Sequence, residues 1–228
     1  MHTPPRPPPI PVDLLLRAYR CGVFPMADFR DDHEVYWVEP KERAIIPLDG
    51  FRLSRSLRKV IRQDRFAVTC DHAFAQVIRE CAAPREEHAE SWISHRIENS
   101  YLALHEGGHA HSIEVWQDGV LVGGLYGVAF DRVFCGESMF SRVPAASKVA
   151  LAWLVAAMRA AGYVLLDCQF MTDHLATLGA VPISQNDYVA RLSEAAGSPS
   201  SSLPEAASRF AAGSSPGKLI AQSLTQTS

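Results

Sequence analysis

Hydrophobic positions follow helical spacing in some stretches of the chain and strand alternation in others. Apolar residues at helical intervals predict short helices over residues 13–21, 54–65, 71–81 and 94–105. Short apolar or alternating runs predict strands over residues 35–38, 44–47 and 66–69. Ser54 and Asp71 stand where a side chain can cap the helix that follows.

The strongest strand pattern lies in the middle of the chain. It predicts antiparallel strands over residues 111–117 and 120–130, with a third strand from Val133. Asp118-Gly119, between the first two, is typical of a tight hairpin. The glycines of residues 123–127 fall inside a strand, so we expect a bulge or a close backbone approach and not a phosphate-binding loop.

The longest helical pattern covers residues 145–161, and Gly162 stands where a left-handed residue ends a helix. Residues 163–169 then predict a buried strand, and residues 172–178 a shorter helix. This order of strands and helices indicates an α+β or mixed α/β fold. We divide the chain into a small N-terminal domain with a proline-rich leader (1–50), a main domain (51–196) and a tail that we expect to be disordered (197–228).

The composition fits a globular protein. The 228 residues are 47% hydrophobic and 21% charged, which is enough apolar material for a stable core. No apolar run approaches the roughly 20 residues that span a bilayer, and the proline-rich start lacks a signal-peptide pattern, so we expect a cytoplasmic protein without a membrane partner. Its five cysteines are widely spaced without a CxxC pair, so we expect reduced thiols and no zinc site.

The net charge of −3 is unevenly distributed along the chain. Six basic residues and one acid lie between Arg52 and Arg65. Four of the six recur at helical spacing and predict a basic stripe suited to phosphates: Arg55, Arg58, Lys59 and Arg62. A solvated face of an amphipathic helix is the alternative, and this segment alone does not decide between them.

Three polar residues carry the candidate chemistry. Asp167 and Gln169 end a buried strand two residues apart, so alternation places them on one face. We expect Asp167 to hold the NH2 group of Gln169, which leaves the Gln169 carbonyl oxygen as an acceptor for an amine or hydroxyl proton. A strand-end Asp that caps the next turn is the alternative. Glu137, in an aromatic strand without a nearby cation, indicates a polar ligand or a buried hydrogen-bond network.

Large apolar residues near the ends of elements predict a hydrophobic pocket, although each alone is more often part of a core. They are Trp37, Trp92, Tyr101, Phe134, Leu154 and Met158. His105, His109 and His111 cluster without metal-binding spacing, so we expect no metal. Ser138 and Ser141 lack a nucleophile-elbow pattern, which favours attack by a bound amine.

A series of short motifs resembles those of the bacterial leucyl/phenylalanyl-tRNA–protein transferases, in the same order and over about residues 12–193. The motifs are Tyr19, GVFPM (22–26), Tyr36-Trp37, SWI (91–93), HAHSIEVW (109–116), GGLYG (123–127), GESMFS (136–141), DCQ (167–169), His174-Leu175 and LGA (178–180). The proline-rich leader and the serine-rich tail lie outside this resemblance.

The resemblance implies a larger domain like the GCN5-related acetyltransferases (GNAT-like) after the small N-terminal domain. It implies transfer of Leu or Phe from aminoacyl-tRNA to an N-terminal Arg or Lys of an acceptor protein, which marks that protein for degradation. No metal or organic cofactor is implied, and we expect a monomer whose basic stripe contacts the tRNA acceptor stem. By position, Asp167, Gln169 and Glu137 match the family's catalytic residues. The residues that match its pocket for the aminoacyl side chain and the terminal adenosine are Trp37, Trp92, Tyr101, Leu125, Phe134, Leu154, Met158 and Leu166.

Two other functions stay open on the sequence. A CoA-dependent N-acetyltransferase would need a pyrophosphate loop before a helix, but the nearest match, Arg159 to Gly162, lies at a helix's C-terminal end. A noncatalytic adaptor that holds charged tRNA would need the basic stripe and the apolar pocket, but not Glu137, Asp167 and Gln169 together. The presence of all three favours an enzyme.

Overall fold

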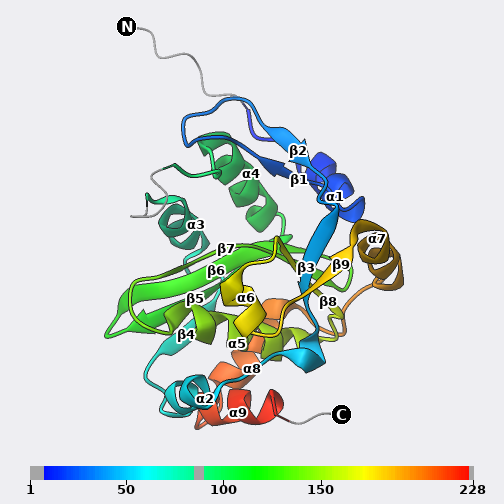
Figure 1. The fold of residues 1–228 in the computed structure, drawn as a ribbon. Helices are drawn as coiled ribbons and strands as arrows, with labels where there is room; N and C mark the ends of the chain where they lie inside the picture. Colours follow the sequence, from blue (N-terminus) through cyan, green and yellow to red (C-terminus); the bar gives the residue numbers. More distant parts are fainter. Residues whose placement is uncertain (1–7, 85–89, 226–228) are drawn as a thin grey trace, which may run out of the picture.

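The computed structural model describes residues 8–84 and 90–225 (Figure 1). The helices are α1 (Val12–Arg20), η1 (Leu48–Gly50), α2 (Arg55–Arg62), α3 (Phe74–Ala82), α4 (His95–Glu106), α5 (Ala146–Ala161), α6 (Asp173–Thr177), α7 (Gln185–Glu194), α8 (Leu203–Ala211) and α9 (Pro216–Ser223). The strands are β1 (Phe24–Met26), β2 (Tyr36–Val38), β3 (Glu42–Ile46), β4 (Ala67–Cys70), β5 (Ala110–Gln117), β6 (Val120–Phe130), β7 (Val133–Ser141), β8 (Leu165–Gln169) and β9 (Val181–Ser184). The mixture of helices and strands confirms an α+β class.

One mixed sheet organises the molecule. Its seven strands lie in the order β4-β5-β6-β7-β8-β3-β9, while β1 and β2 form a separate pair. β7 and β8 are parallel, and the other pairs in the described part of the chain are antiparallel. Among the described residues, no helix has both the length and the apolar character that a membrane span requires.

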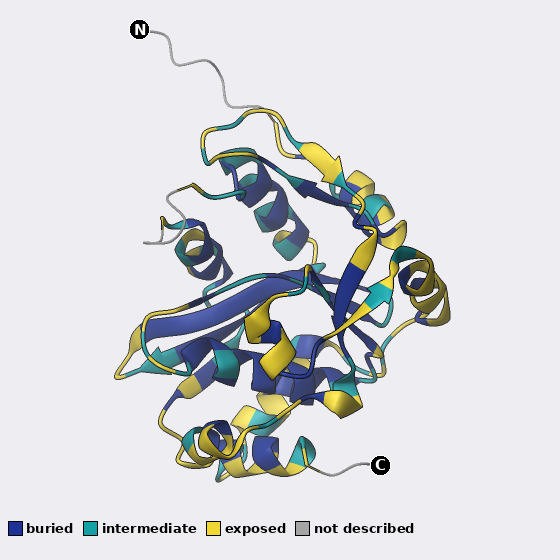
Figure 2. Cartoon of the chain, viewed as in Figure 1, coloured by how far each residue is buried: buried dark blue, intermediate teal, exposed yellow. Residues whose placement is uncertain are grey.

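Helices cover both faces of this sheet. The core on one face contains α5 together with buried residues of α2, α8 and α9. The core on the other face contains buried residues of α1, α3, α4 and α7. Figure 2 shows the long central strands and α5 as almost entirely buried. This double burial explains why β6 is apolar nearly throughout and does not alternate.

Local signals predicted the start of α2 and the end of α5 correctly. Ser54 caps α2 by accepting a hydrogen bond from the Leu57 N–H, Ser94 caps α4 in the same way, and Gly162 ends α5 with a φ of 79°. The predicted cap at Asp71 is wrong. Its carboxylate binds His111 Nδ1 at 2.6 Å and the Ser112 N–H at 2.8 Å, while α3 begins three residues later.

The glycines of β6 mark a bulge and a close approach, as predicted. The register between β6 and β7 shifts between Tyr126 and Gly127. A Cβ atom added at Gly123 would lie 2.5 Å from the Ala146 Cβ atom. The first turn of α5 therefore packs directly on the backbone of β6.

The expectation of a disordered tail is wrong for its described part. Residues 203–211 and 216–223 form α8 and α9, and Ser202 and Glu205 make a capping box at the start of α8. Leu203, Ala206 and Ala207 are buried in the core beside α5. Small alanines at helical spacing allow close helix packing, and a composition rich in Ala and Ser concealed this pattern. Residues 226–228 lie outside the described part.

The division expected after residue 50 does not coincide with the sheets. β1 and β2 pair only with each other, but β3, which precedes residue 50, lies between β8 and β9 in the main sheet. The N-terminal segment therefore contributes directly to the architecture around β8. Residues 1–7 of the proline-rich leader lie outside the described part, whereas the Ile10 N–H already donates to Ser100 Oγ at 2.8 Å.

The parallel strands β7 and β8 pair over only part of their length. Their register joins Val133–Cys135 to Leu165–Asp167 and then stops. From Gly136 in β7 and Cys168 in β8 the two strands line the walls of a pocket. The sheet is thus open at its centre, and the candidate catalytic residues Glu137 and Gln169 lie at this opening.

Candidate active site

The pocket between the ends of β7 and β8, here called the wedge pocket, has a volume of about 800 Å³. Residues from β6, β7, β8, α5, α6 and the loop before α4 line it. Four predicted pocket residues are among them: Trp92, Leu125, Leu154 and Leu166. Glu137 and Gln169 also line it, so the structure brings together two of the three predicted catalytic residues.

One part of the wedge pocket is apolar. Leu151 and Leu154 of α5 contribute to it with Leu125, Leu166 and Leu175. These leucines belong to one core, so the wall is continuous with the protein interior. Such a wall accepts a hydrocarbon side chain and excludes a charged one, because a buried charge would lack a partner.

Glu137 forms the polar part of the wedge pocket. Its Oε1 atom accepts a hydrogen bond from the Tyr19 hydroxyl at 2.7 Å, and its Oε2 atom accepts one from the Tyr101 hydroxyl at 2.9 Å. Burial raises the pKa of Glu137 to about 7, although the hydroxyls of Tyr19 and Tyr101 and the nearby amide of Gln169 act in the opposite direction. The buried hydrogen-bond network expected for Glu137 is confirmed.

Asp167 has a different environment, although it lies on the neighbouring strand. It is fully buried and does not line the wedge pocket. Its two carboxylate oxygens accept hydrogen bonds from Arg43 at 2.9 and 2.6 Å, and Tyr188 donates a third at 3.0 Å. The Arg43 guanidinium lies over the rings of Phe24 and Tyr188 and also donates to the Gly22 carbonyl.

The predicted contact between Asp167 and the side-chain amide of Gln169 is wrong. Asp167 instead accepts the Gln169 backbone N–H at 2.8 Å, so the alternative of an Asp that holds the turn after its strand is the observed one. The φ of Gln169 is 62°, which breaks strand alternation. Gln169 therefore lines the pocket with Leu166 and Cys168, away from Asp167.

The side-chain amide of Gln169 is buried in the wall of the pocket. The residue is 6% exposed, and its Nε2 atom has no hydrogen-bond partner among the described residues. Its amide lies close enough to Glu137 to favour the charged carboxylate. A buried donor without a partner is costly, so this atom is available for a ligand in the pocket.

Four of the predicted pocket residues do not line the wedge pocket. Tyr101 donates a hydrogen bond to Glu137, while Phe134 and Met158 are fully buried in the core. Trp37 is 41% exposed on β2 and lies outside the pocket wall. Spacing alone could not separate core residues from wall residues here, because both are large and apolar.

Sequence reasoning missed several residues of the site. Arg43, Tyr188 and the wall residues Met26, Met139, Leu151 and Leu175 received no role. Arg43 offered a signal, because it directly precedes the apolar run 44–46 and a cation in a buried strand needs an anionic partner. Tyr19 was part of a motif but carried no chemistry until its contact with Glu137 was seen.

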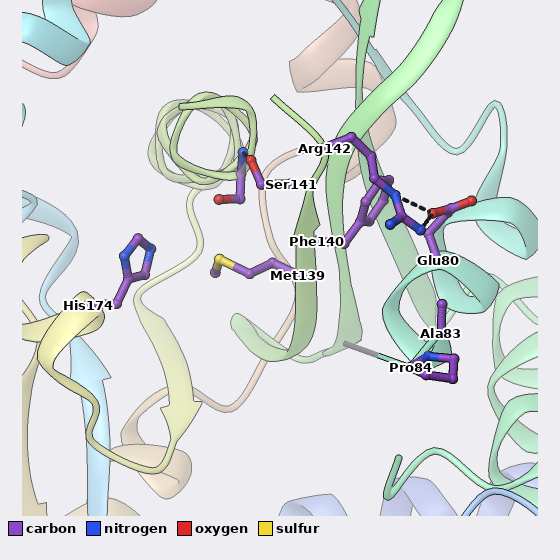
Figure 3. A pocket seen from close by; sticks show the side chains of 9 residues that line it. Glu80, Ala83, Pro84, Met139, Phe140, Ser141, Arg142 and His174 are labelled. Atoms are coloured by element: carbon purple, nitrogen blue, oxygen red, sulfur yellow. Dashed lines mark hydrogen bonds and ion pairs between the residues drawn. The ribbon is translucent and has the colours of Figure 1, made fainter. Parts of the chain in front are cut away.

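A second hollow of about 280 Å³ adjoins the wedge pocket, because Met139 and His174 line both. Figure 3 shows this hollow, with the Arg142 guanidinium on the Glu80 carboxylate at one side and His174 at the other. Burial and the nearby Lys148 lower the pKa of His174, so its ring tends to stay neutral. Within the described residues, no group of histidine, cysteine and acidic side chains could hold a metal ion.

The cysteine that lines the pocket is not an activated nucleophile. Cys168 lines it, but burial and the charge of Asp167 raise the pKa of its thiol far above neutral. The thiol therefore stays protonated. This agrees with a reaction in which the nucleophile is part of a substrate.

The predicted basic stripe lies on α2. Leu57 and Ile61 of this helix are buried, whereas its cationic residues Arg55, Arg58, Lys59 and Arg62 are exposed. The helix is thus amphipathic with one cationic face. Its contact with phosphates stays a prediction.

The comparisons with known proteins agree with this arrangement. The family model described as "Leucyl/phenylalanyl-tRNA protein transferase" matches residues 45–193, and the model of its N-terminal domain matches residues 9–41. A leucyl/phenylalanyl-tRNA–protein transferase of Novosphingobium aromaticivorans is 57% identical over 96% of this chain and 97% of its own. One of Rhizorhabdus wittichii is 64% identical over 81% of this chain and 75% of its own. The solved structure of L-PGS from Bacillus licheniformis is 14% identical with a TM-score of 0.40 over 72% of this chain and 55% of that chain, too weak a likeness to carry an argument.

Proposed function

The chain belongs to the leucyl/phenylalanyl-tRNA–protein transferase family, and from this premise we propose that the wedge pocket holds the aminoacyl ester, with Glu137 and Gln169 in contact with the reacting atoms. The protein is an aminoacyltransferase that moves Leu or Phe from aminoacyl-tRNA to the N-terminal residue of a protein. The single observation that carries the site assignment is the pocket itself, which joins an apolar wall to Glu137 and Gln169.

The leucine wall supports the choice of amino acid. A Leu or Phe side chain that lies against Leu125, Leu151 and Leu154 leaves its ester near the polar end of the pocket. A charged or strongly polar side chain in the same place would lose its hydration without gaining a partner. Specificity thus follows from desolvation.

Positioning supplies most of the catalysis in this proposal. The ester of aminoacyl-tRNA is already activated, so the acceptor amine needs to be held in line with the carbonyl carbon. Gln169, whose Nε2 atom has no partner in the described part of the chain, binds the reacting groups. Asp167 acts at a distance, because it fixes the backbone of Gln169 and is itself neutralised by Arg43.

The acceptors are proteins that begin with Arg or Lys, and the transferred residue marks them for degradation. The anionic Glu137 beside the pocket supports a cationic acceptor. In this proposal the enzyme acts as a monomer, and it works in the cytoplasm, where aminoacyl-tRNA is made and used. The Arg55, Arg58, Lys59 and Arg62 face of α2 contacts the tRNA acceptor stem, as its exposed charges favour.

A GNAT-like fold for the main domain is supported by the parallel pair β7–β8 that separates at its ends to open a site. An acetyl-CoA enzyme is less favoured. Residues 159–162 end α5 at Gly162, so a pyrophosphate there would meet the negative pole of the helix dipole. A noncatalytic adaptor would not need the Glu137 network beside the apolar wall.

The test is transfer of labelled Leu or Phe from charged tRNA to peptides that begin with Arg, Lys, Asp or Ala. We expect transfer to the Arg and Lys peptides, and its loss in the variant Gln169→Ala while charged tRNA still binds. Leu154→Asp should abolish transfer of Leu and Phe because it places a carboxylate in the apolar wall. Binding of charged tRNA without transfer by the unaltered protein would instead establish the adaptor.

A further inference from the structure

Two tyrosines from separate helices hold Glu137. Tyr19 of α1 and Tyr101 of α4 are both fully buried, and each donates to a different oxygen of the carboxylate. Their own hydroxyl oxygens lie 2.5 Å apart. Within residues 8–84 and 90–225, no ion pair involves Glu137. Each carboxylate oxygen keeps a second lone pair, so the clamped carboxylate can still accept a proton from the pocket side.

The transfer reaction needs a group that can carry a proton. The attacking amine loses one proton when its C–N bond forms, and the ribose oxygen gains one when the C–O bond of the ester breaks. The side-chain amide of Gln169 accepts hydrogen bonds but is not a base near neutral pH. Asp167 is enclosed by Arg43 and Tyr188 outside the pocket wall. Among the carboxylates in the described part of the chain, Glu137 alone lines the pocket.

We propose that Glu137 is the proton carrier of the transfer reaction and that Tyr19 and Tyr101 are positioning residues that hold its carboxylate for this task. This inference rests on the proposed function. The carboxylate takes the proton from the attacking nitrogen as the tetrahedral adduct forms. It then gives that proton to the ribose oxygen that leaves, so the products are an amide and a free tRNA hydroxyl, and Glu137 returns to its charged form.

The surroundings of Glu137 suit this cycle. The groups that face it are Tyr19 from α1, Tyr101 from α4, Tyr126 from β6, Gln169 and Asp167 from β8, and Arg43 of β3 beside Asp167. Burial raises its pKa to about 7, and the hydrogen bonds from the tyrosines lower it. A carboxyl group that changes charge near neutral pH both accepts and returns a proton readily.

The experiment measures single-turnover transfer of Phe from saturating Phe-tRNA to an Arg-initiated peptide between pH 5.5 and 8.5, with the full chain. The transfer rate of the unaltered enzyme should rise with pH, with a midpoint near pH 7. This midpoint lies below the pH at which the peptide's own amine titrates. Glu137→Gln should remove this rise. Tyr19→Phe and Tyr101→Phe should each move it upward by about one pH unit, because the lost hydrogen bond favoured the charged carboxylate.

Matched controls make the result specific. Tyr163→Phe changes a buried tyrosine whose neighbours are Cys70 and Asp71 and not Glu137, so it should leave the profile unchanged. His174→Gln tests the imidazole of the pocket wall and should also keep the rise near pH 7. Thermal melting of every variant shows whether it is folded at the assay temperature.

Several results would overturn the inference. A uniform loss of rate in Tyr19→Phe and Tyr101→Phe, without a shift of the profile, would reduce the tyrosines to a structural role. Persistence of the rise in Glu137→Gln, or its loss in His174→Gln, would assign the proton to another group. Absence of transfer by the unaltered enzyme would contradict the proposed function itself, which is a separate and recognisable failure.

Discussion

Glu137 and Asp167 are two buried carboxylates on neighbouring strands, and their surroundings differ in one decisive respect. Asp167 has Arg43 as an enclosed partner, with both side chains fully buried. Glu137 has two neutral tyrosines and an opening to the wedge pocket. Burial alone therefore does not identify the reactive acid. The presence or absence of a compensating cation separates the carboxylate that holds the fold from the one that we propose for the reaction.

The largest effect should come from breaking the Asp167 pair. Asp167→Ala leaves the buried Arg43 guanidinium without its anion, and we expect the free energy of unfolding to fall by about 3–5 kcal/mol. Denaturant unfolding measures this loss. The double variant Asp167→Leu with Arg43→Met should recover much of the lost stability. If it is no more stable than Asp167→Ala, the pair is not the cause.

The next effect concerns the pH dependence of stability. The folded-state pKa of Glu137 is raised to about 7, above its ordinary value of 4.5. Between these two pKa values the folded protein therefore holds a proton that the unfolded chain releases. The contribution of Glu137 to the free energy of unfolding is full below about pH 4.5 and is lost as the pH rises through about 7. The loss amounts to roughly 3 kcal/mol. In unfolding measured from pH 5 to 8, the stability of Glu137→Gln should change with pH by this amount less than the stability of the unaltered protein. An unchanged pH dependence of stability would mean that Glu137 is not buried in its acid form.

The smallest effect concerns exposed charges, in contrast to the two buried carboxylates. Arg58→Ala with Lys59→Ala should weaken tRNA binding at every salt concentration and lower the salt slope by roughly 1.5, because two phosphate contacts are lost. Fluorescence titration of tRNA at several salt concentrations measures both quantities. Arg17→Ala with Arg191→Ala removes two exposed cations from α1 and α7 and serves as the matched control. Equal losses of tRNA affinity in the two double variants would mean that the cationic side of α2 is an ordinary solvated face.

The sequence predicted features that depend on nearby residues. Ser54 and Gly162 mark helix ends, and the hairpin between β5 and β6 forms at Asp118-Gly119. Each of these signals acts over a few residues. Glu137 was recognised for a similar reason, because a carboxylate in an aromatic strand is costly without a partner.

Features that depend on distant residues were not predicted. Arg43 and Asp167 are 124 positions apart in the chain, and no local pattern links them. The left-handed backbone of Gln169 overrides strand alternation and turns its side chain into the pocket. The helices α8 and α9 depend on packing against the face that contains α5 and α2. In each case the tertiary fold supplies the partner that the local sequence lacks.

The most direct test of the contrast between the two carboxylates is transfer by Glu137→Gln. The amide keeps the size of the side chain but cannot carry the proton. We expect a folded protein that binds charged tRNA and transfers Phe to an Arg-initiated peptide at least ~100-fold more slowly than the unaltered enzyme at pH 7.5. A rate within about threefold of the unaltered enzyme would contradict the account, because general acid–base catalysis by Glu137 would then contribute too little to matter.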